Sequence, residues 1–79
     1  MDLEKILAEN VRTFRKLRGL TQKDLAQVSG IHKQFWAGIE RGERNITLSS
    51  LQRIAIALDV EPHVLLTRGS ARWFDVQKK

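Results

Sequence analysis

The chain has 79 residues and no cysteine, and its 14 lysines and arginines outnumber its 9 acidic residues, which gives a formal net charge of +5. This length predicts one domain with a small core, and the absence of cysteine excludes disulfide bonds and cysteine-ligated zinc. The positive charge favours a polyanionic partner (nucleic acid, an acidic membrane or an acidic protein), while the lack of a signal core or of an apolar run near ~20 residues predicts a cytoplasmic protein.

Apolar side chains at three- and four-residue steps predict a first amphipathic helix that ends at Gly19. These side chains are Leu3, Ile6, Leu7, Val11, Phe14 and Leu17. Thr21 is a typical N-cap for a short second helix, and Gly30, a residue that adopts positive φ without strain, is expected to end it. A third helix is predicted over about residues 32–41.

Thr47 is expected to cap a fourth helix whose apolar residues share one stripe. These residues are Leu48, Leu51, Ile54, Ala55 and Leu58. Pro62 stands at the first position of a fifth short helix, which is predicted to end at about Arg68. Because no segment of residues 1–68 alternates with the period of two of a strand, we expect a compact all-α domain of five helices there, followed by a C-terminal tail over residues 69–79.

The segment from Gln22 to Ile39 matches the helix-turn-helix pattern. A small residue is needed where the two helices cross, and Ala26 stands there; the turn between them needs positive φ, and Gly30 stands there. Apolar residues occupy the positions that hold the two helices to each other and to the core. They are Leu25, Ile31, Trp36 and Ile39. This set of spacings predicts that the third helix is a recognition helix.

Helical geometry divides the third helix into two faces. Trp36, Ile39 and Glu40 share the inner face, whereas Gln34, Ala37, Gly38 and Arg41 lie opposite. A recognition helix places its N-terminal part in the major groove, so Lys33, Gln34 and His32 are expected to read base edges. The small residues Ala37 and Gly38 would allow close approach to DNA. Phe35 could contact a thymine methyl group or complete the edge of the core.

Four stretches of the chain resemble the phage-repressor (Cro/repressor-like) helix-turn-helix family. They are Thr21–Ala26, Ser29–Ile31, Ile39–Gly42 and Leu51–Val60, and the resemblance covers about residues 4–68. Gly38–Arg41 followed by Arg44–Leu48 is particularly similar to the controller proteins of restriction–modification systems. The resemblance implies a lambda-repressor-like domain that binds double-stranded DNA, with the helix-turn-helix at helices two and three.

The resemblance also implies contacts to the DNA backbone. Gln22, at the start of the second helix, matches a family position that contacts a phosphate, which helix N-termini favour. Arg41, Arg44 and Asn45 are expected to contact phosphates as well. A free surface loop is the alternative for Arg44 and Asn45.

The family pattern matches Arg15 and Glu40 to a partly buried ion pair between helices one and three. Glu40 faces inward by helical geometry and therefore needs a cation, so this pair is interpreted as structural. The two histidines, His32 and His63, are far apart in sequence and have no acidic residues at ligand spacing, and no glycine-rich phosphate loop is present. We therefore expect no catalytic activity, no metal site and no cofactor.

These patterns predict a sequence-specific transcriptional regulator that acts as a homodimer on a palindromic operator, and the controller-like features imply autoregulation. Val64, Leu65 and Leu66 of the fifth helix, with the end of the fourth, are expected to form the dimer interface. The alternative is an antitoxin-like protein whose main role is to bind a partner protein. Its interaction segment would be the tail with Trp73 and Phe74, although packing of this tail on the body or on a dimer partner is favoured.

Overall fold

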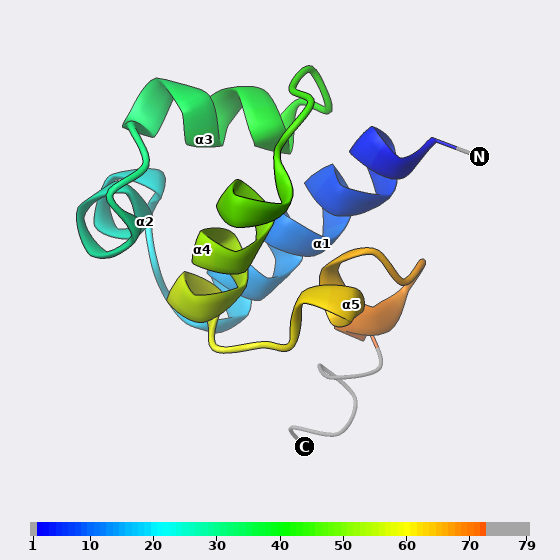
Figure 1. Cartoon of the computed structure of the whole chain (residues 1–79). Coiled ribbons are helices and arrows are strands. Elements are labelled where there is room, and N and C mark those ends of the chain that lie inside the picture. The colour runs from blue at the N-terminus through cyan, green and yellow to red at the C-terminus, as the bar shows by residue number, and fades with distance from the viewer. Residues whose placement is uncertain (1, 73–79) are drawn as a thin grey trace.

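The structure, a computed structural model, describes residues 2–72, which form a bundle of helices around one core (Figure 1). In chain order the helices are α1 (Leu3–Leu17), α2 (Gln22–Ser29), α3 (Lys33–Glu40), α4 (Leu48–Leu58) and α5 (Pro62–Leu65). The described residues contain no strand, so the predicted all-α class is confirmed. None of the helices in this part of the chain is long and apolar enough to cross a membrane.

Side-chain caps define where the helices begin. The Asp2 carboxylate accepts a hydrogen bond from the Lys5 N–H at 3.1 Å, and the Thr47 hydroxyl accepts one from the Ser50 N–H at 3.0 Å. Each cap satisfies a backbone N–H that the first helical turn leaves without an intrahelical acceptor. α2 ends at Gly30, whose φ of 73° is left-handed and strains any residue that carries a Cβ.

The core is built from one face of each helix. α1 lies against α3, α4 and α5, while α2 packs on α3 and α4. The largest fully buried side chains come from all five helices: Trp36, Phe14, Leu25, Ile39, Ile54, Leu58, Leu65 and Val11. Because Trp36 has an exposed fraction of 0%, its indole anchors α3 to the rest of the molecule.

α5 ends at Leu65, so the predicted end near Arg68 is wrong. The buried Asn10 of α1 donates from Nδ2 to the carbonyl oxygens of Leu65 at 2.8 Å and of Thr67 at 2.9 Å. The Leu65 carbonyl group, the last of α5, is thus bonded to α1, whereas that of Thr67, beyond the helix, also accepts from the Ser70 N–H at 3.2 Å. The helix therefore stops after four residues, and the chain turns back along α1.

The first residues of the predicted tail pack against the body. Ala71 has an exposed fraction of 3% and belongs to the core, and the Ser70 hydroxyl donates to the carbonyl oxygen of Val64. The packed body therefore extends beyond the predicted boundary at residue 68. Trp73 and Phe74 lie outside the described residues.

Candidate nucleic-acid interface

α2 and α3 are joined by a turn that contains a polar contact as well as apolar ones. The Ser29 hydroxyl donates to the Leu25 carbonyl oxygen at 2.6 Å and accepts from the Ile31 N–H at 3.1 Å. It also accepts from Nε1 of Trp36 at 3.0 Å. One hydroxyl thus links the end of α2, the turn and the anchor of α3, a role that the sequence pattern did not reveal because Ser29 is an ordinary helix-end residue. This contact fixes the direction in which α3 leaves the turn.

α3 presents a polar N-terminal half to solvent. His32, Lys33 and Gln34 are exposed, and Ala37 is half-buried beside them. Nδ1 of His32 accepts from the Gln34 N–H at 3.2 Å, so the imidazole caps α3 in addition to facing outward. The predicted base-reading residues Lys33 and Gln34 therefore lie on one free surface at the helix start, a position suited to contact with base edges.

Phe35 and Gly38 are not on that free surface. Phe35 is half-buried against the core, and the Arg44 guanidinium carbon lies 5.2 Å from the centre of its ring. Gly38 is buried, and the side chain of Arg44 lies over it. The sequence-based placement of Gly38 on an open outer face is therefore wrong for the free protein, because a residue from the following loop covers that position.

The residues expected at phosphates differ in their surroundings. Arg41, Arg44 and Asn45 are exposed, and Arg41 pairs with Glu43 at 3.0 Å. Gln22 is half-buried at the start of α2, where its Nε2 donates to Oε1 of Glu40 at 3.2 Å. Its side chain is therefore tied to the recognition helix.

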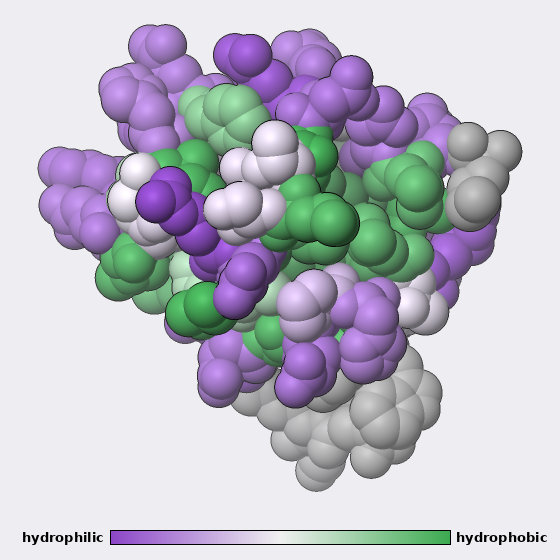
Figure 2. All heavy atoms as spheres, in the orientation of Figure 1, coloured by the Kyte–Doolittle hydropathy of each residue, from purple (hydrophilic) through white to green (hydrophobic). Residues whose placement is uncertain are grey.

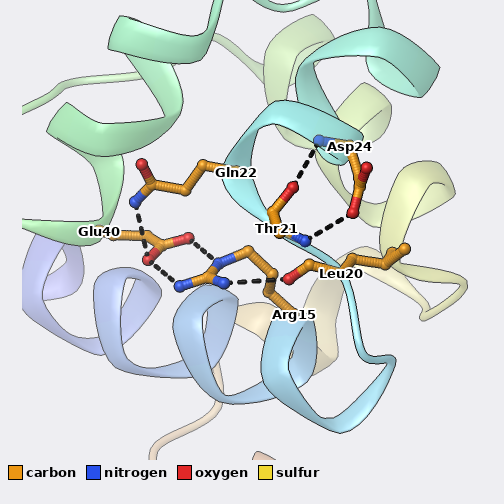
Figure 3. Close-up of polar contacts among 6 residues, drawn as sticks. All are labelled: Arg15, Leu20, Thr21, Gln22, Asp24 and Glu40. Carbon is orange, nitrogen blue, oxygen red and sulfur yellow. Dashed lines mark hydrogen bonds and ion pairs between the residues drawn. The ribbon is translucent and has the colours of Figure 1, made fainter.

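Arg15 of α1 and Glu40 of α3 form a two-pronged ion pair below this surface (Figure 3). Arg15 Nε lies 2.7 Å from Oε2 and Nη2 lies 3.0 Å from Oε1, while Nη1 donates to the Leu20 carbonyl oxygen at 3.0 Å. The hydrogen bond to Glu40 raises the pKa of Arg15 above its ordinary value, against the opposing effect of burial. The pair holds α1, the loop before α2 and α3 together.

The predicted dimer interface needs correction. Leu65 has an exposed fraction of 0% and Val64 one of 9%, so both belong to the core of the single chain and are not available to a partner. Only Leu66 of the predicted three is exposed, at 37%. α5 turns its apolar side toward α1 and α4, and the sequence pattern alone did not indicate which side of so short a helix faces inward.

A different apolar surface is open on α4 and beside it. Leu48 is 84% exposed and Ile56 is 70% exposed, although Leu48 was predicted to share the buried stripe of α4. Leu48 is the first residue of α4 and lies beyond the edge of the core. Two adjoining grooves share Leu48 and Leu51; one reaches Ile56 and the other reaches Leu3 and Leu66. Figure 2 shows hydrophobic side chains gathered on this face within a hydrophilic rim. We call Leu3, Leu48, Ile56 and Leu66 the α4 surface.

A buried anchor, a left-handed turn and an exposed polar helix start together define a class of protein. α2 and α3 form a helix-turn-helix in which α3 is the recognition helix, as in DNA-binding proteins of this architecture. The family model described as helix-turn-helix matches residues 11–65. The chain belongs to this family of DNA-binding transcriptional regulators.

Within the family the chain is similar to control proteins. It is 48% identical to the control protein C.SmaI of Serratia marcescens over 68 residues, which are 86% of this chain and 81% of that protein. The restriction-modification controller protein C.AhdI from Aeromonas hydrophila matches with a TM-score of 0.76 at 37% identity, over 78% of this chain and 94% of that one. The controller protein C.Esp1396I, as a tetramer with its natural 35 base-pair operator, matches with a TM-score of 0.75 at 34% identity, over 82% of this chain and 86% of that one.

Proposed function

We propose that this protein is a control-protein-like regulator that binds a palindromic operator as a homodimer. The observation that carries the proposal is the exposed start of α3, where Lys33 and Gln34 face solvent on a helix that the buried Trp36 holds firmly. Lysine suits guanine edges and glutamine suits adenine edges. We further propose that Gln22, Arg41, Arg44 and Asn45 contact phosphates around this helix.

The homodimer follows from the limited reach of one recognition helix. A single helix reads only a few base pairs, and two-fold symmetry doubles the site. The α4 surface supports the proposal, because apolar side chains as open as Leu48 and Ile56 are expected to be covered by a partner. We therefore place the dimer contact on the α4 surface, with Leu66 retained from the sequence-based prediction and Val64 and Leu65 removed from it.

In-vitro selection of duplex DNA from a random library tests the proposal directly. We expect enrichment of two inverted half-sites whose centres lie about one helical turn, or a multiple of ~10 base pairs, apart. Enrichment of a single half-site would contradict the dimer, and the absence of any enriched sequence would contradict sequence-specific binding.

Autoregulation is proposed from the similarity to control proteins, since C.Esp1396I is described as a tetramer on its operator. Two dimers on adjacent sites would convert gradual accumulation into a switch whose midpoint depends on dimerisation. Footprinting of the DNA upstream of the protein's own gene is expected to show cooperative protection. No protection there, or a non-cooperative isotherm across the dimerisation range, would exclude autoregulation and leave the general regulator in place.

The antitoxin-like alternative finds no support among the relatives reported above, which are control and controller proteins. We also propose that the chain is not an enzyme, because its family acts by binding DNA, and that it works in the cytoplasm with its DNA.

A further inference from the structure

The loop after α3 returns the chain over the recognition helix. Gly42 has a φ of 75°, and its N–H donates to the Ile39 carbonyl oxygen at 2.9 Å while the Glu43 N–H donates to that of Gly38 at 3.0 Å. This pair of bonds closes a helix C-terminus and reverses the chain direction. Arg44, the next residue, is thereby brought back over Gly38 and Phe35.

Gly38 leaves room for the Arg44 side chain. A Cβ at position 38 would lie 2.9 Å from both Cγ and Nε of Arg44 and 3.4 Å from its Cδ, and these are its three nearest atoms. Gly38 stands inside α3 without a positive φ, where alanine would be the better helix former. The glycine therefore gains nothing for α3 itself; what it permits is the close approach of Arg44.

Phe35 also contacts the Arg44 side chain. Its ring is held against the core, and the Arg44 guanidinium carbon lies 5.2 Å from the ring centre, within the range of a cation–π interaction. Arg41, nearby on the same helix end, has its charge matched by Glu43. Within residues 2–72, Arg44 has no acidic partner, so its charge remains available to an anion.

We propose that Phe35 and Gly38 are positioning residues that hold the Arg44 guanidinium across the outer side of α3 so that it binds a phosphate of the DNA backbone. The inference rests on the proposed function and deepens it: Phe35 and Gly38 act through Arg44 and do not read bases. An arginine side chain that is already held in place loses less conformational freedom when it contacts DNA. The phosphate contact is tighter for that reason.

The substitution Gly38→Ala distinguishes a role of Gly38 in positioning Arg44 from a purely structural role. Alanine is the better helix former, so the urea midpoint of unfolding is expected to stay the same or rise. Affinity is expected to fall on the order of ten-fold for each protomer bound, the value of one charge-assisted hydrogen bond. The fall is expected on both a selected operator duplex and a scrambled duplex, because a phosphate contact carries no sequence information. The slope of log K against log salt should flatten by about 0.9 for each protomer bound, the share of one phosphate, and so by about twice that for the dimer.

A double-mutant cycle tests whether Gly38 acts through Arg44. Arg44→Ala is expected to reproduce the loss in affinity and slope, and Gly38→Ala added to it should have no further effect. Phe35→Leu keeps an apolar side chain but removes the ring. It should lower affinity about two- to five-fold for each protomer bound, the value of one exposed cation–π contact, and only while Arg44 is present. Arg12→Ala, an exposed residue of α1, removes the same charge elsewhere and should leave the salt slope close to that of the wild type.

A loss of affinity by Gly38→Ala that persists without Arg44 would show that Gly38 meets DNA directly and would overturn the proposal. Unchanged binding by Gly38→Ala or by Arg44→Ala, when the wild type binds normally, would also overturn the proposal. If the wild type binds neither duplex, the proposed function fails, and this inference fails with it.

Discussion

Glu40 is the acidic residue on which the contacts between three parts of the chain converge. Its carboxylate accepts from Arg15 at 2.7 and 3.0 Å and from Gln22 at 3.2 Å, and Glu40 is only 6% exposed (Figure 3). A buried carboxylate is tolerated because these donors replace the water that it has lost. Glu40 therefore links α1 and the start of α2 to the recognition helix.

Glu40→Ala is expected to lower the free energy of unfolding, because it leaves Arg15 largely buried without its anion. Breaking a buried pair costs about 3–5 kcal/mol, and the partial exposure of Arg15 places the loss at the lower end. Urea denaturation measures it. Glu40→Gln retains a hydrogen-bond acceptor and should lose less, and a midpoint of Glu40→Ala equal to that of the wild type would show that the pair contributes nothing to stability.

Asp24 is expected to make stability depend on pH in the acid range. The Thr21 N–H donates to the Asp24 carboxylate at 2.9 Å, and the bonds with Thr21 lower the pKa of Asp24 below its ordinary value. A carboxyl group whose pKa is lowered by folding stabilises the native state above its unfolded pKa, near 4, and loses that contribution as the pH falls through its folded pKa.

The stability difference between wild type and Asp24→Ala should therefore be largest at neutral pH and disappear well below pH 4, as followed by urea unfolding at both pH values. Thr47→Ala is the matched control. It removes the hydroxyl that caps α4, whose first turn contains no acidic residue, so the effect of this substitution should persist in acid. A pH-independent effect of Asp24→Ala would contradict the assigned pKa shift.

The residues at the start of α3 and those further along it have different roles. Lys33 and Gln34 lie free at the N-terminal end, whereas Phe35 and Gly38 further along are occupied by Arg44. Side chains that reach base edges give sequence preference, and those that reach phosphates give affinity without preference. We therefore expect α3 to read bases through Lys33 and Gln34, while Phe35 and Gly38 hold Arg44 of the following loop for its phosphate contact.

Lys33→Ala and Gln34→Ala should each relax preference at one base pair of the half-site, costing about 1–3 kcal/mol there and little on a scrambled duplex. Arg44→Ala should instead weaken binding to both duplexes alike and flatten the salt slope. Affinities for a set of single-base operator variants measure the difference. Equal behaviour of all three variants would contradict the division into base-reading residues, Lys33 and Gln34, and a phosphate-binding residue, Arg44.

The apolar side chains of the α4 surface are exposed, and Figure 2 shows hydrophobic side chains on this face among hydrophilic ones. Ile56 is 70% exposed, so replacing it with lysine removes little packing from the single chain. A lysine at this position of the α4 surface would have to be desolvated when a partner covers it, so the substitution tests association directly.

Ile56→Lys is expected to leave the folded monomer intact but to prevent dimer formation, which sedimentation would detect as a monomer where the wild type sediments as a dimer. Binding to a palindromic duplex should fall, whereas binding to a single half-site should not. Ile56→Val, which retains an apolar side chain, is the control. A dimer of Ile56→Lys with normal affinity would place the interface elsewhere.

Spacing along the chain was sufficient to predict the five helices α1 to α5, with only the end of the fifth misplaced, the helix-turn-helix and most of the core. These features depend on which residues share a face of one helix, as with Trp36 and Ile39, and on local groups such as Thr21 and Gly30 that start or end it. Together with the family resemblance, the same reasoning placed Glu40 inward, so that a cation partner was required.

Contacts between distant segments depended on how the helices cross and where the loops return, which periodicity does not specify. Arg44 covers Gly38 because a loop reverses the chain, and α5 stops because Asn10, 55 residues away in sequence, takes the carbonyl group of Leu65. The same packing buries Leu65 within the chain and leaves Leu48 open. Local sequence determines which faces are apolar, whereas the tertiary arrangement determines which of those faces are covered by the chain itself, because burial depends on the position of every other helix at once.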